Sequence, residues 1–217
     1  FAIVPDWIEL ANFDIKATIC RIGTSEEADV HLKTGLDSDG FASISIDGHV
    51  EPLSMLGEHN AWNCAFGIVA CLKACQDTSM QSLMRTVSSI PPPEGRMQLK
   101  EVNGVTFIDD SYNANPASMV AALDLFSTLE ARRKVLILGD MLELGEHAHA
   151  EHRSLAQAIA QANADLTILV GSNMNAVSQS IPCIYEPDSS PEALDRITSL
   201  LKNGDSVLLK GSRALRL

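Results

Sequence analysis

The sequence predicts an α/β protein: a β-rich part with two helices, followed by a mostly parallel sheet with flanking helices. The first observation behind this prediction is the alternation of strand-type and helix-type runs, joined by short links, from residue 105 onward. The second is that two of these strands, Val135–Leu138 and Val207–Leu209, are apolar throughout, as strands buried on both faces must be. The third is the different pattern before residue 57, where short runs alternate apolar and polar residues.

In the β-rich part, alternation predicts a small antiparallel meander with turn signals at Asp37–Gly40 and Asp47-Gly48. Its strands are expected at Lys16–Gly23, Ala28–Lys33, Phe41–Ile46 and Val50–Leu56. Helical spacing then predicts helices over Asn60–Cys75 and Ser79–Ser88. Three consecutive prolines at 91–93 cannot continue a helix and form a stiff connector. We therefore expect two domains, residues 1–94 and residues 95–217.

The second part is expected to form a doubly wound parallel sheet, because its strands and helices alternate. The predicted strands are Val105–Asp109, Lys134–Leu138, Leu166–Val170 and Ser206–Leu209. The predicted helices are Ala117–Leu129, Glu151–Ala162 and Pro191–Leu201.

Composition narrows the function classes. The chain has 217 residues, 46% of them apolar and 20% charged, which is typical of a globular protein. Its 16 Lys and Arg against 28 Asp and Glu give a net charge of −12, so it lacks the basic footprint of nucleic-acid or anionic-membrane binding. We expect no membrane span and no signal peptide. Five cysteines do not make a disulfide framework, and we expect them reduced and buried in a cytoplasmic protein.

Polar segments follow four predicted strands, and they should meet at one edge of the sheet, where ligands of open α/β sheets bind. Asp109 and Asp110 can hold ribose hydroxyls, a metal or an amine, and Tyr112 and Asn113 lie in the turn beyond them. Asn115 followed by Pro116 is also typical of an ordinary helix N-cap. The remaining strands are followed by Gly139–Gly145, Gly171–Asn173 and Lys210–Arg213.

Other residues suit anionic or nucleotide ligands. Lys210 and Arg213 fit a carboxylate or phosphate, although a solvated helix start would look the same. Arg96, after the prolines, could clamp a phosphate. Asn60 and Asn63 share a helix face and could read an adenine edge, while Asn60 could equally cap its helix.

Several motifs are absent. His149 and His152 could share a helix face, but the sequence has no H-E-x-x-H motif and no cysteine partner for them, so we expect helix-start histidines, with His152 lining the site, and no metal. The chain has neither the glycine-rich phosphate loop of nucleotide-binding enzymes nor the nucleophile elbow of serine hydrolases.

Five segments together resemble the Mur ligases, and within that family the enzymes that add D-alanyl-D-alanine. They are Leu56–Asn63, Gly95–Met97, Asp109–Pro116, Gly139–Gly145 and Lys210–Arg213. The resemblance implies a Rossmann-like last domain after the tail of a P-loop-type ATPase domain. It also implies that the chain is the C-terminal part of a longer enzyme, inactive alone, with the phosphate loop and most Mg²⁺ ligands elsewhere.

The resemblance implies an ATP- and Mg²⁺-dependent ligase in peptidoglycan precursor synthesis. A carboxylate of a UDP-N-acetylmuramoyl tripeptide would be activated as an acyl phosphate, and the amine of D-alanyl-D-alanine would attack it. We expect a monomer without nucleic-acid or membrane partners.

Carried over by position, the nucleotide side comprises Asn60, Asn63, Arg96, Asp110, Tyr112 and Asn113. The dipeptide side comprises Asn115, Asp140, Met141, Glu143, Lys210, Ser212 and Arg213, with Lys210 or Arg213 pairing the dipeptide carboxylate. No catalytic residue is assigned. The alternatives are a folylpolyglutamate-type ligase, which the Asp109–Asn113 string disfavours, and a non-catalytic nucleotide or amino-acid binding module.

Overall fold

The computed structural model describes residues 1–11, 14–75 and 77–217. The chain divides into two compact units, Phe1–Pro91 and Pro92–Leu217. Each unit is described by itself.

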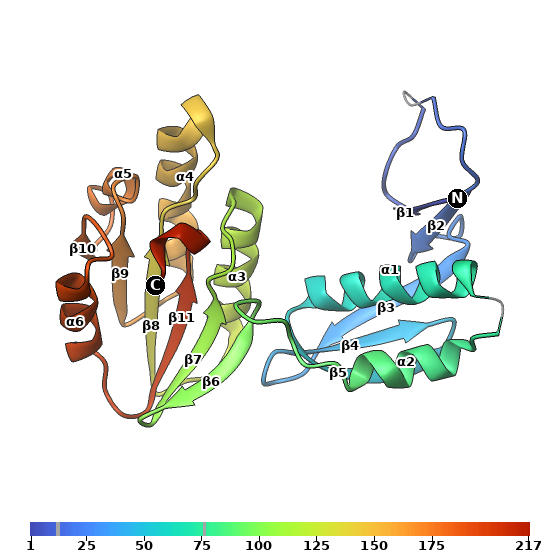
Figure 1. Ribbon diagram of the computed structural model, residues 1–217, viewed down its shortest axis with the longest axis horizontal. Coiled ribbons are helices and arrows are strands. Elements are labelled where there is room, and N and C mark those ends of the chain that lie inside the picture. Colours follow the sequence, from blue (N-terminus) through green and yellow to red (C-terminus); the bar gives the residue numbers. More distant parts are fainter. Residues whose placement is uncertain (12–13, 76) are drawn as a thin grey trace. The chain divides into compact units, whose positions relative to one another are not determined.

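The first unit contains a five-stranded sheet in the order β1-β2-β3-β4-β5 (Figure 1). Its strands are β1 (Ala2–Pro5), β2 (Ile19–Gly23), β3 (Val30–Leu36), β4 (Phe41–Ile46) and β5 (His49–Leu56). Strands β3, β4 and β5 form the predicted antiparallel pairs. The rest differs from a meander, because β1 was not predicted and the β1–β2 and β2–β3 pairs are parallel. Alternation marks a strand but carries no information on the direction of its neighbour.

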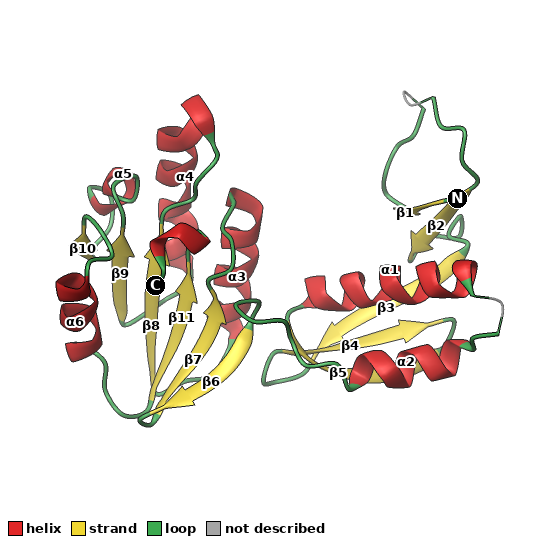
Figure 2. Ribbon diagram, in the orientation of Figure 1, coloured by secondary structure: helices red, strands yellow, loops and turns green. Residues whose placement is uncertain are grey.

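Helices α1 (Glu58–Ala74) and α2 (Met80–Ser88) follow the sheet and pack against it and each other (Figure 2). Their apolar sides meet the alternate inward residues of β2–β5, including Ile22, Leu32 and Ile44, in one core. Gly57 occupies the N-cap position of α1. Asn60 therefore does not cap this helix; it lies one turn inside, and its amide donates to the carbonyl of Leu56 at 2.8 Å.

All five cysteines are free thiols, as predicted. The expectation that they are buried is wrong for most of them. Cys20 is buried, Cys64 and Cys183 are half-buried, and Cys71 and Cys75 are exposed near the end of α1. Cys71 lies in the last turns of α1, and Cys75 is the extended residue that ends the helix, so neither faces the core.

The second unit is built on a six-stranded sheet in the order β10-β9-β8-β11-β7-β6. Its strands are β6 (Gln98–Val102), β7 (Val105–Asp110), β8 (Arg133–Gly139), β9 (Leu166–Val170), β10 (Ile184–Glu186) and β11 (Asp205–Lys210). Every neighbouring pair is parallel except β6–β7. The predicted mostly parallel sheet with flanking helices is thus confirmed, and β6 and β10 are edge strands that were not predicted.

Helices cover both faces of this sheet. They are α3 (Pro116–Thr128), α4 (Ala148–Gln161), α5 (Asn175–Ser178) and α6 (Pro191–Ser199). Helix α6 packs Ile197 against Val135, Ile137 and Val207 of the central strands. The intervening strand residues, such as Leu136, point to the other face, where α3, α4 and α5 contact one another in sequence. Two 3₁₀ turns follow in the loops after the carboxyl ends of β8 and β11. They are Gly145–His147 and Arg213–Leu215.

Among the described residues, no helix is both long and apolar enough to cross a membrane.

The central strand β8 should dominate the stability of the second unit. Leu136 is fully buried, and we expect Leu136→Ala to lower the free energy of unfolding by about 2–5 kcal/mol because it leaves a cavity. Leu99→Ala on β6 is the control, since Leu99 is 42% exposed and should cost less than about 1 kcal/mol. Urea titration of both variants measures the difference, and equal losses would contradict this account of the core.

Candidate functional site

Four strand ends meet at one edge of the six-stranded sheet, as predicted. Lys210 at the end of β11 lies beside Asp110 of β7 and Leu138 of β8, and Gly139 lies beside Val170 of β9. The loops that follow also touch: the Leu142 amide donates to Ser212 Oγ at 2.9 Å. The polar segments found in the sequence therefore form one surface.

The two carboxylates that end β7 point to opposite faces of the sheet, and each pairs with a lysine from a different neighbouring strand. Asp109 lies 2.6 Å from Lys100 Nζ of β6. Asp110 lies 2.5 Å from Lys210 Nζ of β11, and that ammonium also donates to the carbonyl of Asn113 at 3.1 Å. The side chain of Lys210 is 2% exposed, so its ammonium group is buried and serves the protein's own carboxylate and carbonyl.

The Asp109 carboxylate also organises the turn that follows it. Its Oδ1 accepts hydrogen bonds from the Ser111 amide at 3.1 Å and the Ser111 hydroxyl at 2.6 Å. Burial raises the pKa of the Asp109 carboxyl, but the hydrogen bonds from Lys100 and Ser111 outweigh this effect and hold the pKa below its ordinary value. Asp109 is therefore an ionised group in a largely buried position.

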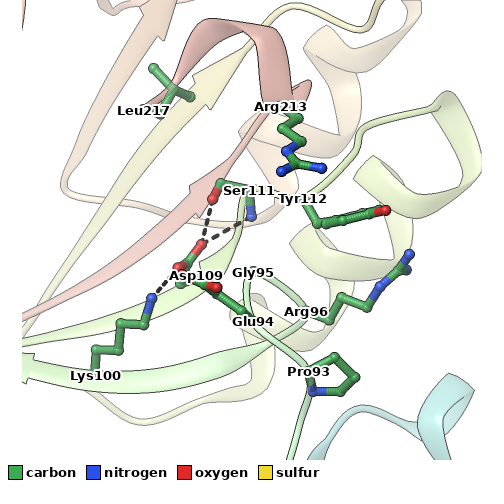
Figure 3. A pocket seen from close by; sticks show the side chains of 10 residues that line it. All are labelled: Pro93, Glu94, Gly95, Arg96, Lys100, Asp109, Ser111, Tyr112, Arg213 and Leu217. Carbon is green, nitrogen blue, oxygen red and sulfur yellow. Dashed lines mark hydrogen bonds and ion pairs between the residues drawn. The ribbon is translucent and has the colours of Figure 1, made fainter.

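A cavity of about 670 Å³ opens beside this turn (Figure 3). Its lining includes Lys100, Asp109, Ser111, Tyr112, Arg96 and Arg213. In Figure 3 the Tyr112 ring lies between two guanidinium groups, with Arg96 Cζ 4.3 Å and Arg213 Cζ 5.6 Å from the ring centroid. Both distances are within the range of a cation–π contact.

The lining of this cavity holds one exposed carboxylate, Glu94, and the two arginines are its exposed cations. Both are exposed, and within the described residues neither has a carboxylate within ion-pair distance. Guanidinium groups bind carboxylates and phosphates through paired N–H donors. Two like charges held on either side of one ring repel each other, and a bound anion would relieve that repulsion. The arrangement is therefore suited to an anionic ligand.

Gly95 brings the segment of Arg96 close to Tyr112. The Tyr112 amide donates to the Gly95 carbonyl at 3.0 Å, and Gly95 has a φ of +66°. A Cβ atom at this position would lie 3.0 Å from the Tyr112 nitrogen, so both the turn and the close approach favour glycine.

A second group of predicted site residues forms a buried hydrogen-bond network. Asp140 accepts from the amides of Asn173 at 3.2 Å and Met174 at 2.9 Å. The Ser212 amide donates to the Asp140 carbonyl at 3.0 Å. Asp140, Met141 and Ser212 are each at most 5% exposed, so they hold the loops together and present little surface to a ligand.

His152 belongs to the same network. Its ring is fully buried, and Nε2 accepts the Met141 amide at 2.9 Å, which places the ring proton on Nδ1 facing the carbonyl of Ala148 at 2.6 Å. The expectation that His152 lines the site is wrong, because the ring is fully buried and links the Met141 amide to the carbonyl of Ala148. Nowhere in the described ranges do three potential metal ligands gather.

The remaining predicted residues are placed as follows. Asn115 caps α3, and its side chain accepts from the Ser118 amide at 2.8 Å, which is the ordinary role foreseen for it. Asn113 is exposed and accepts from the Ala114 amide through its own Oδ1. Glu143 is exposed with a φ of 64°. Asn60 and Asn63 belong to the first unit, where their side chains are 3.5 Å apart.

Lys100 and Ser111 were not predicted as site residues, and Asp109 was considered only as one of two strand-end carboxylates. Ser111 and Asp109 lie inside a segment already singled out. Lys100 had no such signal, because β6 was not recognised. The Asn103-Gly104 dipeptide between β6 and β7 was the missed sign of a two-residue hairpin, and both residues have positive φ.

Comparison with known proteins gives consistent results. Residues 95–213 match the family described as "Mur ligase, glutamate ligase domain". The UDP-N-acetylmuramoyl-tripeptide--D-alanyl-D-alanine ligase of Haemophilus influenzae is 32% identical over 186 residues, which are 82% of this chain and 40% of that relative. The ligase of the same name from Treponema pallidum is 35% identical, over 74% of this chain and 36% of that relative.

Solved structures agree in fold. A MurF crystal structure from Acinetobacter baumannii aligns with a TM-score of 0.80 at 25% identity, covering 98% of this chain and 49% of that one. MurF from Thermotoga maritima in complex with ADP aligns with a TM-score of 0.74 at 22% identity, over 91% of this chain and 46% of that one. This chain thus spans less than half the length of these relatives.

The ionised state of Asp109 leads to a pH prediction. Because the folded pKa is lowered, the carboxylate stabilises the fold above the unfolded pKa of about 3.9, and this contribution disappears as the pH falls through the folded pKa. Asp109→Asn should be less stable by about 1–3 kcal/mol at neutral pH, and the gap from the original protein should shrink toward about pH 3. Urea titrations across this range test it, with Asp195→Asn on α6 as control. A gap that stays constant would contradict an ionised, stabilising Asp109.

Proposed function

The chain belongs to the Mur ligase family, and we propose that it is the C-terminal part of an ATP-dependent ligase that joins D-alanyl-D-alanine to a UDP-N-acetylmuramoyl tripeptide. The names of the relatives from Haemophilus influenzae and Treponema pallidum support this substrate pair. The observation that carries the proposal for this chain is the Tyr112 ring between the guanidiniums of Arg96 and Arg213, to which the described residues supply no ion pair, at the edge of a cavity.

Each side of the ring would serve one anion. Arg213 follows β11 and would pair with the carboxylate of the dipeptide. Arg96 follows the proline connector and would contact phosphate. Lys210 was the alternative partner for the carboxylate, but its burial and its ion pair with Asp110 favour Arg213. Asn113 and Glu143 are exposed on the flanking turns and are further candidates for substrate contact.

ATP would supply the phosphoryl group that activates the tripeptide carboxylate, and the dipeptide amine would then displace phosphate to form the amide. The residues of this chain would act by binding and orientation. Two guanidiniums attract the anionic groups, and the ring fixes their separation. The T. maritima relative was solved with ADP, and Arg96, Tyr112, Asn60 and Asn63 are the residues here whose chemistry suits a nucleotide.

The resemblance to the Mur ligases implies that most Mg²⁺ ligands lie outside this chain. In the described part of the chain no three acidic, histidine or cysteine residues gather as metal ligands, and the sequence has no glycine-rich phosphate loop. We therefore assign no Mg²⁺ ligand to these residues.

The proposed function is tested by phosphate release from the complete protein that contains this chain. The assay supplies ATP, Mg²⁺ and the UDP-muramoyl tripeptide, with D-alanyl-D-alanine or single amino acids as the amine. We expect release that depends on D-alanyl-D-alanine. Release with glutamate and a folate instead would favour a folylpolyglutamate-type ligase, and no release from well-folded protein with any amine would favour a binding module.

Arg213→Ala should affect one substrate more than the other. Loss of a charge-assisted hydrogen bond should raise the KM for D-alanyl-D-alanine by about tenfold to a hundredfold, with a much smaller change for ATP. Arg153→Ala is the matched control, because Arg153 is exposed on α4, outside the cavity lining. Equal increases in both KM values would contradict the assignment of Arg213 to the carboxylate.

A further inference from the structure

We propose that Asp109 and Asp110 are positioning residues that hold the Ser111–Tyr112 turn from opposite faces of the sheet, each through a lysine of a neighbouring strand, so that the Tyr112 ring stays between Arg96 and Arg213. The inference rests on the proposed function, because it assigns roles within the same site. It gives functions to Lys100, Asp109 and Ser111, and functions different from those first expected to Asp110 and Lys210.

The first anchor lies on the face of the cavity. Asp109 reaches forward to Ser111, which it binds through both the amide and the hydroxyl. Lys100 balances the charge from β6 at 2.6 Å. Ser111 immediately precedes Tyr112, so these bonds fix the direction in which the chain leaves β7.

The second anchor lies on the opposite face. Asp110 accepts from the Met97 amide at 3.2 Å and pairs with Lys210 at 2.5 Å. Lys210 also binds the carbonyl of Asn113, on the far side of Tyr112. The turn is therefore held before and after the tyrosine, and the Arg96–Met97 segment is held to the same carboxylate.

The anchors matter because the Tyr112 side chain is partly exposed to solvent. Tyr112 is 43% exposed, and its ring lies within cation–π distance of two exposed arginine side chains. An exposed ring on a free turn would sample many orientations, and ordering it when a ligand binds would weaken affinity. A turn that is already ordered before the ligand binds avoids that entropic cost. The ion pairs Asp109–Lys100 and Asp110–Lys210 provide this order.

The direct test observes the ring. In the complete protein labelled with ¹³C-tyrosine, Tyr112→Phe and Tyr185→Phe identify the ring NMR signals of the two tyrosines of this chain. Ser111→Ala and Lys100→Met should shift or broaden the Tyr112 signals and leave those of Tyr185 unchanged. Lys100→Arg should restore them, because it keeps the cation. Lys202→Met, at an exposed lysine outside the cavity lining, should change neither set.

Kinetics of the complete enzyme provide the second readout. In Ser111→Ala and Lys100→Met we expect KM for ATP or for D-alanyl-D-alanine to rise about tenfold with a smaller change in kcat, and Lys100→Arg to recover most of the loss. A merely structural role would lower the melting temperature without this split. Melting curves identify any variant that fails to fold.

The outcomes are distinguishable from those of the function assay. Unchanged Tyr112 signals in folded Ser111→Ala and Lys100→Met would overturn the anchoring role. Moved signals with unchanged KM values would overturn the claim that the anchors serve substrate binding. If the unsubstituted enzyme shows no release dependent on D-alanyl-D-alanine, the proposed function fails, and the NMR comparison still decides the anchors.

Discussion

The pairing of two adjacent carboxylates with two lysines is the constraint on which the ligand edge of the second unit depends. Neighbouring residues of a strand point to opposite faces, so Asp109 and Asp110 cannot share one partner. A charge removed from water needs its own counter-ion and hydrogen bonds, and removing one partner of such a pair is costly. Lys100 from β6 and Lys210 from β11 meet this need. The same contacts align the ends of three adjacent strands, since β7 lies between the two strands that supply the cations.

Beyond these strand ends the polar residues divide into two classes by burial. Asp140, Met141, His152 and Ser212 are enclosed and bind backbone groups of the loops around them. A residue in this network can influence a ligand only through the loops it holds. Arg96 and Arg213, together with the Tyr112 ring, remain open. Because the buried polar residues hold the loops and the exposed arginines do not, the same sheet edge can be rigid and still present cations to a ligand.

The parts of the structure that sequence could predict are those encoded by local patterns. Continuous apolar runs located β8 and β11, and the Asn115-Pro116 pair located the start of α3. The strand-end rule placed the polar segments at one edge. Partners distant in sequence were beyond such reasoning: the Lys210–Asp110 pair spans 100 residues, and nothing local distinguishes a lysine that will be buried from one that will meet a ligand. Lys100 was missed for a different reason, since the strand that carries it was overlooked despite its Asn-Gly turn.

The arginine–tyrosine–arginine arrangement also bears on how an anion would reach this surface. The chain carries a net charge of −12, so at low ionic strength its long-range field repels the anions that the two guanidiniums attract at short range. In physiological salt the screening length is about 8 Å, and the repulsion fades while contacts at the ring distance persist. Association with an anion should therefore be governed by the last few ångströms of approach, and moderate salt should hinder it less than it hinders proteins that steer ligands with an overall opposite charge.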